Sequence, residues 1–294
     1  MELNSSFLVP RSSFLVPRSS FLVPHSSFLV PRSSFLIPYS SFLVPHSSFL
    51  ILTYRLVVTP TQISQDQITL DPQQLHYLLR VLRLDNGDRF IAMDGKGKAW
   101  LAEIKEQSAR IIESIKIETE LPVYLTLITA LPKGNGYEQI IRCCTELGVS
   151  NFRPVISDRT ILKPSSSKVQ RWRKIATEAA EQSERQIVPH IFDPVKFKAA
   201  ISTTQQYQDK YICVARGQPA MWNSISHQTQ SEVIIATGCE GGWTESEIAQ
   251  AKESGMKPVS LGKRILRAVT APIVASSLVV AMLEQTNPIL PDQG

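Results

Sequence analysis

Two glycine-bearing stretches near the C-terminus decide the fold: Gly238-Cys-Glu-Gly-Gly242 and Leu261-Gly-Lys-Arg-Ile-Leu-Arg267. Each follows a short apolar run that predicts a buried strand. A third glycine-bearing stretch, Leu131-Pro-Lys-Gly-Asn-Gly136, follows another apolar run. Glycines let backbone groups approach a ligand closely, and open α/β folds bind ligands outside the carboxyl ends of their strands. The three stretches therefore predict a ligand site at one edge of an α/β sheet.

The pattern around these stretches is that of an α/β domain. From residue 122 onward, strands are expected at 123–131, 151–156, 211–215, 232–237 and 258–261. Helices are expected at 137–147 and 168–183, from the capping-box residue Thr244 to Gly255, and from about Val269. This alternation is typical of a mainly parallel sheet. None of the glycine stretches matches a P-loop or GxGxxG, which argues against a different nucleotide-binding α/β enzyme.

A smaller, β-rich domain is expected over residues 53–121, ahead of the α/β domain over 122–294. Its strands are expected at 54–58, 89–93, 99–104 and 109–117. Asp71-Pro72 predicts a helix start, with the aspartate as cap and the proline in the first turn. The helix carries Leu75, Leu78, Leu79 and Leu82 on one face.

The first 52 residues repeat one heptapeptide, Ser-Ser-Phe-Leu-Val-Pro-Arg, from Ser5 onward with slight variation. A proline in each repeat and three consecutive apolar residues exclude a coiled coil. No uninterrupted apolar region fits a signal peptide. We expect a disordered low-complexity tail, translated from repetitive DNA ahead of an original start near Thr53-Tyr54.

Charge, cysteines and hydropathy narrow the class of protein. The net charge of +5 and the apolar content of 43% fit a soluble globular protein, but the charge excess alone does not indicate a polyanionic partner. The four cysteines form no CxxC pair, and no histidine lies at metal-ligand spacing from them, so we expect reduced thiols and no metal site. The longest apolar run, 268–283, is shorter than the ~20 residues of a membrane-spanning helix. It predicts a buried helix at a subunit interface in a cytoplasmic protein without a membrane anchor.

The motifs quoted above resemble those of the ribosomal RNA small subunit methyltransferase E family, within the SPOUT superfamily. The resemblance covers about residues 54–284. It rests on stretches that occur in the family's order: 76–88, 133–149, 181–189, 237–247 and 260–271. The first of these is similar to the family's amino-terminal PUA-like RNA-binding domain, and the others to its catalytic domain.

This resemblance implies a SPOUT-type trefoil-knotted α/β methyltransferase domain preceded by a small PUA-like β-barrel domain. It implies methylation of N3 of a uridine in 16S ribosomal RNA, with S-adenosylmethionine as cofactor, the small ribosomal subunit as partner and a homodimer as the assembly. The residues that it implies for cofactor binding, largely through backbone atoms, are Gly238, Glu240, Gly241, Gly242, Leu261, Gly262, Arg264, Ile265, Leu266 and Arg267.

The sequence departs from the family pattern at two positions. Cys239 replaces the proline of the family's Gly-Pro-Glu-Gly-Gly, and Val269 replaces the glutamate of its Leu-Arg-Thr-Glu-Thr-Ala. The first change affects loop stiffness, whereas the second removes a carboxylate. Both changes support a second hypothesis, a non-catalytic RNA-binding protein that retains the fold. Binding of S-adenosylmethionine distinguishes the methyltransferase from this alternative, which predicts no binding.

Catalytic residues are expected among the arginines. Uridine N3 is a poor nucleophile until its proton leaves, so positioning and stabilisation of the uracil anion should supply most of the rate. No His–Asp or Cys–His arrangement indicates a base. Because arginine stays charged and donates in a planar fork, Arg185, Arg159 and Arg264 are predicted as catalytic in that order, with surface ion pairing as the alternative for each.

Basic side chains also gather between residues 159 and 174, where phosphate contacts would give salt-dependent affinity for RNA. A solvated helix face is the alternative reading of such a run. With the PUA-like domain, the run predicts RNA contacts, with Trp172 interleaved and bases read in single-stranded regions. The predicted contact residues are Arg80, Arg83, Lys163, Lys168, Arg171, Arg173 and Lys174.

Overall fold

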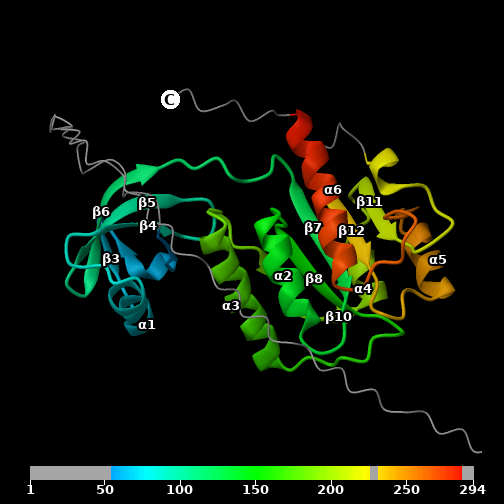
Figure 1. Ribbon diagram of the computed structural model, residues 1–294, viewed down its shortest axis with the longest axis horizontal. Coiled ribbons are helices and arrows are strands. Elements are labelled where there is room, and N and C mark those ends of the chain that lie inside the picture. Colours follow the sequence, from blue (N-terminus) through cyan, green and yellow to red (C-terminus); the bar gives the residue numbers. More distant parts are fainter. Residues whose placement is uncertain (1–53, 226–230, 287–294) are drawn as a thin grey trace, which may run out of the picture. The chain divides into compact units, whose positions relative to one another are not determined.

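The computed structural model describes residues 54–225 and 231–286, and its strands form two sheets (Figure 1). The tail predicted over residues 1–52, with its hypothetical origin ahead of Thr53, lies outside the described residues. The first sheet uses residues 55–115 and the second begins at residue 124. The division of the chain at residues 52 and 121 stays a prediction.

The first sheet has six strands in the order β1-β4-β5-β6-β3-β2. The strands are β1 (Arg55–Val57), β2 (Ile63–Ser64), β3 (Gln67–Thr69), β4 (Arg89–Met93), β5 (Ala99–Lys105) and β6 (Ser108–Ile115). Short helices η1 (Pro60–Gln62), α1 (Pro72–His76) and η2 (Tyr77–Val81) connect them. Neighbouring strands are antiparallel except β1 and β4, which are parallel. Sequence patterns missed β2 and β3 because strands of two or three residues show no periodicity.

The helix start predicted at Asp71 is confirmed, since the Asp71 carboxylate accepts from the backbone N–H groups of Gln73 and Gln74. The leucine face that follows packs on one face of the sheet. Leu78 is fully buried there beside Ile68 and Phe90, and Leu75, Leu79 and Leu82 are partly buried against the same cluster. The helical segment therefore closes the core of the first sheet.

The second sheet has seven strands, in the order β10-β8-β7-β12-β11-β13 with β9 beside β8. The strands are β7 (Tyr124–Ala130), β8 (Asn151–Ile156), β9 (His190–Ile191), β10 (Val195–Lys196), β11 (Asp209–Cys213), β12 (Glu232–Thr237) and β13 (Lys257–Val259). Every pairing is parallel, which confirms the predicted mainly parallel sheet. All the loops that follow these strands therefore leave from one edge.

Helices cover both faces of this sheet, so it is buried on both sides. They are α2 (Gly136–Glu146), α3 (Ser166–Gln182), α4 (Phe197–Ser202), α5 (Glu245–Glu253) and α6 (Thr270–Thr286), with the short η3 (Met221–Asn223). Alternation along each strand assigns the faces: Leu125 and Leu127 pack with α2, α3 and α6, whereas Ile128 and Ala130 pack with α4 and α5. Figure 1 shows α2, α3 and α6 together on the near face.

Two predicted helix boundaries have the expected geometry. Thr244 and Glu247 form the capping box that begins α5. Gly148 follows α2 with φ +88°, and a Cβ there would lie 2.8 Å from Leu121 Cδ1. Only glycine satisfies both demands at residue 148.

Backbone and carboxylate contacts join the first sheet to the segment around the end of α3. Val57 N donates to Glu181 Oε1 at 2.7 Å, and Arg55 Nη1 lies 2.8 Å from Glu184 Oε1. Burial raises the pKa of the Glu181 carboxyl to about 7, the Val57 N–H opposes the shift, and nearby Glu178 adds to it. A carboxyl with a raised pKa therefore sits where β1 meets α3.

Within residues 54–225 and 231–286, no helix has both the length and the apolar content that crossing a membrane requires. The same residues contain no group of three or more His, Cys, Asp or Glu side chains placed to hold a metal ion. All four cysteines are free thiols.

Candidate functional site

A cavity of about 850 Å³ lies at the carboxyl edge of the second sheet. Its walls come from the loops that follow four strands, and each loop brings the residues directly after its strand. Arg159 follows β8, 213–215 end β11 and lead on from it, 238–243 follow β12, and 261–262 with 264–269 follow β13. The parallel pairing of these strands is what gathers loops that are far apart in sequence.

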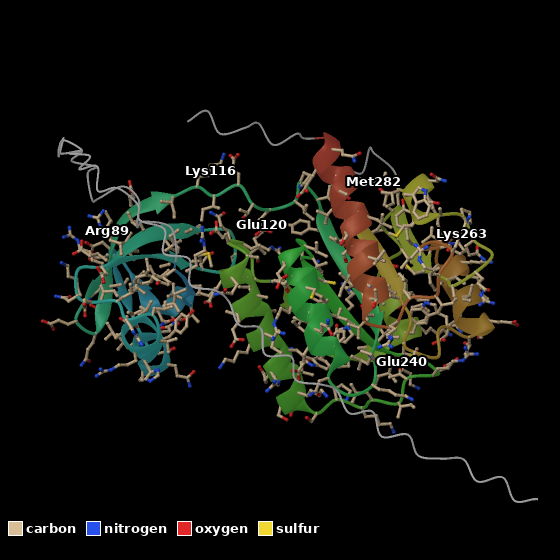
Figure 2. The ribbon with its side chains drawn as sticks, viewed as in Figure 1. Arg89, Lys116, Glu120, Glu240, Lys263 and Met282 are labelled. Carbon is tan, nitrogen blue, oxygen red and sulfur yellow. The ribbon has the colours of Figure 1, made fainter. Side chains whose placement is uncertain are left out.

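The residues predicted for cofactor binding all line this one cavity, and the predicted catalytic Arg159 lines it with them. Figure 2 shows Glu240 near the end of the sheet where α6 begins, with Met282 towards the opposite end of that helix. The sequence motifs thus converge in space, and their individual roles remain predictions.

The Gly238–Gly242 loop is a tight turn that side chains would obstruct. A Cβ on Gly238 would lie 3.2 Å from Gly242 Cα, and Gly242 has φ +68°. Gly242 N donates to Cys239 O at 2.9 Å and closes the turn. The Cys239 side chain is buried in the core that contains α4 and α5, and its Sγ lies 3.8 Å from Ser157 Oγ. The side chain of Cys239, which stands where the family pattern has proline, therefore packs in the protein interior.

Arg159 ties the loop after β8 to the loop after β12. Its Nη1 donates to Gly241 O at 2.6 Å and to Trp243 O at 3.3 Å. A Cβ on Gly241 would lie 3.0 Å from Arg159 Cδ, so glycine is what permits this approach. Asp158 strengthens the link, since its N donates to Glu247 Oε1 at 2.9 Å and its carboxylate accepts from Thr244 Oγ1 at 3.0 Å.

The loop after β13 turns at Gly262, whose φ of +118° lies in a region that favours glycine. Ser260 Oγ accepts from Gly262 N at 3.2 Å and donates to Gly262 O at 3.1 Å. The loop ends at α6, where Arg267 O accepts from the N–H groups of Thr270 and Ala271 at 2.9 Å. The turn at Gly262 therefore places residues 264–269 along the cavity wall, directly before α6.

The third glycine-bearing stretch, residues 131–136, does not line the cavity, but it contacts two residues that do. Lys133 N donates to Glu240 Oε1 at 3.0 Å. A Cβ on Gly136 would lie 2.8 Å from Val269 Cγ2, so Val269 packs against the start of α2. Where the family pattern has a carboxylate, this chain has an apolar contact that only glycine at residue 136 accommodates.

Two residues of the cavity wall, Cys213 and Trp243, carry polar side-chain atoms. Burial raises the pKa of the Cys213 thiol to about 12, so the thiol is neutral at physiological pH. The Trp243 indole N–H is buried with no hydrogen-bond partner among the described residues. A neutral thiol is a poor nucleophile, so Cys213 is not indicated as a nucleophile.

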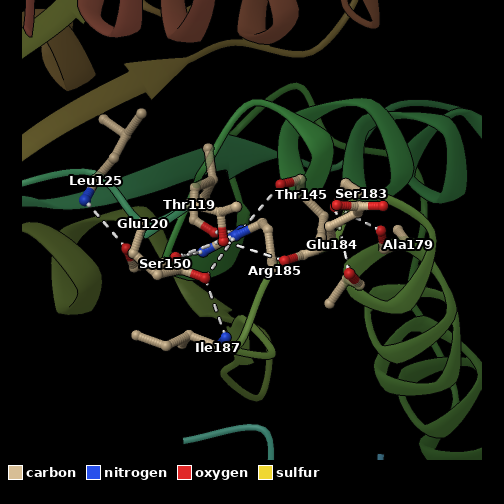
Figure 3. Close-up of polar contacts among 12 residues, drawn as sticks. Thr119, Glu120, Leu125, Thr145, Ser150, Ala179, Ser183, Glu184, Arg185 and Ile187 are labelled. Carbon is tan, nitrogen blue, oxygen red and sulfur yellow. Dashed lines mark hydrogen bonds and ion pairs between the residues drawn. The ribbon is translucent and has the colours of Figure 1, made fainter. Parts of the chain in front are cut away.

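Arg185, the first predicted catalytic residue, lies elsewhere and does not line the cavity. Its side chain is 2% exposed. Nη1 donates to Thr145 O at 2.9 Å and to Val149 O at 2.8 Å, and Nη2 donates to Glu120 Oε2 at 2.7 Å (Figure 3). Glu120 also accepts from Ile187 N at 3.0 Å. The geometry assigns Arg185 a structural function, which is to hold the end of α2 and the segment before β7 together.

The predicted RNA-contacting residues are dispersed, and several are occupied by partners. Arg80 and Arg83 are exposed beside the first sheet, and Lys163 is exposed after β8. Lys168 Nζ donates to Gly134 O, and the other three are paired: Arg171 with Glu138, Arg173 with Asp193 and Lys174 with Glu178. Trp172, which lies between Arg171 and Arg173 in the sequence, is fully buried with its ring centroid 4.5 Å from that of Tyr137, so its ring does not face the surface.

Sequence reasoning missed part of the cavity wall: Cys213, Val214, Ala215, Trp243, Ile248, Ala268 and Ala271. The first three end β11 or follow it directly. The rule that ligands lie at the carboxyl ends of parallel strands was sufficient to identify them, but this loop has no glycine at its start to draw attention to it.

Comparisons with known proteins agree with this geometry. Residues 70–115 match the RNA methyltransferase PUA domain, and residues 119–280 match the RNA methyltransferase domain. The ribosomal RNA small subunit methyltransferase E of Synechocystis sp. is 47% identical over 80% of this chain and 79% of its own length. The protein of the same name from Bacillus subtilis is 32% identical over 82% of this chain and 99% of its own.

A solved structure supports the same conclusion. The crystal structure of ribosomal RNA small subunit methyltransferase E from Neisseria gonorrhoeae, bound to S-adenosyl methionine, is 31% identical with a TM-score of 0.71, over 80% of this chain and 98% of that one. The predicted fold class is thereby confirmed: a SPOUT-type trefoil-knotted α/β domain preceded by a PUA-like domain. The chain belongs to the ribosomal RNA small subunit methyltransferase E family.

Proposed function

We propose that this protein transfers a methyl group from S-adenosylmethionine to N3 of one uridine in the 16S RNA of the small ribosomal subunit. Family membership supports the coarser activity, S-adenosylmethionine-dependent methylation of ribosomal RNA. The observation that carries the proposal is the convergence of both glycine loops with Arg159 and Arg264 on a single cavity. The uridine N3 position and 16S specificity are the finer part of the proposal.

The lining of the cavity fits the proposed cofactor. Glycine turns at 238–242 and 262 expose backbone groups, as recognition through the backbone requires. Cys213, Val214 and Leu261 give an apolar wall against which the flat base of the cofactor can lie. The cavity lies within the ~300–1,000 Å³ range of small-ligand sites.

When bound, S-adenosylmethionine supplies an activated methyl group, and the side chains must prepare the uridine. Loss of the N3 proton to solvent water leaves an anion spread over N3 and the two carbonyl oxygens of uracil. Arg159 and Arg264 line the cavity and, in the described residues, neither forms an ion pair with a carboxylate. We assign them the stabilisation of this anion, which lowers the cost of removing the proton. Arg185 has no place in this step, since its donors are already used inside the protein.

We also propose that a second copy of the chain covers α6. The helix is apolar on all sides, with Glu284 as its one charged residue. Ala275, Val279 and Leu283 are buried in the core, whereas Ile273, Leu278, Val280 and Met282 are only partly buried. A helix with apolar side chains on all sides favours burial on all sides, and a homodimer provides it.

The reaction is tested by mapping N3-methyluridine in ribosomal RNA from a strain that lacks this gene. We expect one 16S position to lose the modification and to regain it when the gene returns. The alternative, a non-catalytic RNA-binding protein, rests on Cys239 and Val269. Calorimetry separates the two, because the alternative predicts no binding of S-adenosylmethionine. An unchanged modification map, or methylation at another atom, contradicts the proposal.

A further inference from the structure

A second cavity, of about 490 Å³, lies at the amino edge of the second sheet. Tyr124 and Asn151, which line it, are the first residues of β7 and β8. The glycine hairpin at 95–96 and the segment 187–191 complete the wall. A strand of six or seven residues spans about 20 Å, so this cavity is separated from the cofactor cavity by the length of the sheet.

The lining of this second cavity suits an anion. Lys96 and Arg173 are cationic, His190 is exposed, and no carboxylate is among the lining residues. Arg173 Nη2 is 2.9 Å from Asp193 Oδ1, and Nε and Nη2 donate to Ile191 O at 3.4 and 3.3 Å, while the Arg173 side chain remains 38% exposed. Ser150, Asn151 and Thr177 add polar side chains to the wall.

An exposed aromatic ring lies in the same place. Tyr124 begins a strand whose other residues are all buried, yet it is 58% exposed. Leaving a large ring in water has a cost that a stacking partner removes. Cationic groups combined with an accessible aromatic ring are typical of sites that bind single-stranded nucleic acid.

Backbone hydrogen bonds hold the walls of the cavity together. Val188 N donates to Gly95 O at 2.9 Å, Gly97 N donates to Gln186 O at 3.2 Å, and His190 N donates to Ser150 O at 2.9 Å. A Cβ on Gly95 would lie 3.0 Å from Val188 Cγ2, so the hairpin approaches this segment closely. The cavity is therefore preformed, which reduces the ordering cost of binding.

We propose that this cavity binds a nucleotide of a single-stranded RNA segment distant from the target uridine. The Tyr124 ring stacks on the base, and Lys96 and Arg173 contact the phosphate. This inference rests on the proposed function, because it assigns a further contact to the same substrate RNA. Since the cavity lies at the edge opposite the cofactor cavity, it contributes to substrate affinity and leaves the methyl transfer itself unchanged.

The test uses the full chain with Tyr124→Ala and Lys96→Glu, and with Lys98→Glu as the matched control. Lys98 is exposed on the same hairpin but does not line the cavity. The probes are a short fluorescent oligouridylate and purified small subunits that lack the modification. We expect Tyr124→Ala to weaken oligouridylate binding about tenfold, as loss of a base stack does. Lys96→Glu should reduce the salt slope by about 0.7, the value for one phosphate contact on a single strand.

In kinetics with small subunits, both variants should raise KM with unchanged kcat, and Lys98→Glu should behave as the unmodified protein. Calorimetric binding of S-adenosylmethionine is measured in parallel and should be the same in all four proteins. If the unmodified protein does not bind S-adenosylmethionine, the proposed function is wrong. The oligouridylate result can still be interpreted in that case, because it is measured separately. Unchanged oligouridylate affinity overturns the inference, even where binding to whole subunits weakens, because the contact is then with ribosomal protein. An equal effect of Lys98→Glu also overturns it, since the cavity is then not what binds.

Discussion

The two edges of the second sheet use arginine in opposite ways. At the carboxyl edge, Arg159 is exposed and lies along a glycine turn, with a single nitrogen engaged by the backbone carbonyls of Gly241 and Trp243. At the amino edge, Arg185 is 2% exposed, and its three nitrogens all have partners within the protein. A guanidinium whose nitrogens all have partners inside the protein stabilises the fold, whereas one with free nitrogens can serve a substrate. The residue type is the same, and its surroundings determine which use it has.

The largest effect is expected at the buried arginine. Arg185→Met removes a donor from both the Thr145 and the Val149 carbonyls, although Gly148 N still donates to Thr145 O, and it leaves Glu120 without its cation, so we expect a loss of about 3–5 kcal/mol in the free energy of unfolding. Urea denaturation measures it. The control is Lys174→Met, which breaks the exposed pair with Glu178 and should cost less than ~1 kcal/mol.

A different result at Arg185 would reverse the comparison. If Arg185→Met is as stable as the unmodified protein but cannot methylate, the buried arginine acts on substrate and the assignment of the two edges is wrong.

The next effect is kinetic. Arg159→Ala should lower kcat about 10²–10³-fold, the usual consequence of removing one group that stabilises developing charge. Urea denaturation should show a change of less than ~1 kcal/mol, because the side chain is exposed. Lys263→Ala is the control: it changes an exposed cation of the loop after β13 that does not line the cavity. Equal loss of activity in both variants would indicate a general effect of positive charge.

The glycine turn gives a smaller effect, on cofactor binding. Gly262→Ala places a Cβ on a residue with φ +118°, with no neighbour within 4 Å, so strain of ~1–3 kcal/mol is the expected cost. If the loop relaxes to relieve it, S-adenosylmethionine should bind roughly 5- to 100-fold more weakly in calorimetry. Gly217→Ala is a matched control, since that glycine has φ +71°, an open surround and no place in the cavity. If Gly217→Ala weakens binding of S-adenosylmethionine as well, the turn at Gly262 has no specific role in cofactor binding.

The smallest effect concerns pH and the contact between β1 and α3. The Glu181 pKa of about 7 lies above its ordinary 4.5, so its stabilising contribution is complete below pH ~4.5 and is lost as pH rises through 7. Glu181→Gln stays neutral and keeps an acceptor for Val57 N. The variant should therefore be more stable than the unmodified protein at pH 8, by roughly 1–2 kcal/mol, and similar to it at pH 4.5. Urea denaturation at the two pH values checks this, and an equal difference at both would refute it.

Much of the fold was predictable because its signals are local. Apolar runs marked β7, β8 and β12, and residues such as Asp71, Gly148 and Thr244 marked helix ends. β9, β10 and α4 were missed, because elements of two to six residues lack a readable period. The trefoil knot came only from the resemblance, since threading leaves no mark in periodicity.

The residues of the candidate site also divide into those that the sequence predicts and those that only the structure reveals. The glycine stretches were found because they serve the backbone, and backbone geometry restricts residue type directly. The burial of Arg185 could not be predicted, because nothing near it in the sequence indicates its pairing with the carboxylate of Glu120. The burial of Trp172 could not be predicted either, since it depends on Tyr137 of another helix. Side-chain roles that depend on distant partners require the structure.

One measurement tests the central claim most directly. Purified protein and its Arg159→Ala variant are incubated with labelled S-adenosylmethionine and small subunits that lack the modification, and the methylated nucleoside is identified by mass spectrometry. The account predicts N3-methyluridine in 16S RNA from the unmodified protein, and from the variant at a rate about 10²–10³-fold lower. No methylated nucleoside, a product other than N3-methyluridine, or equal rates for the two proteins would contradict it.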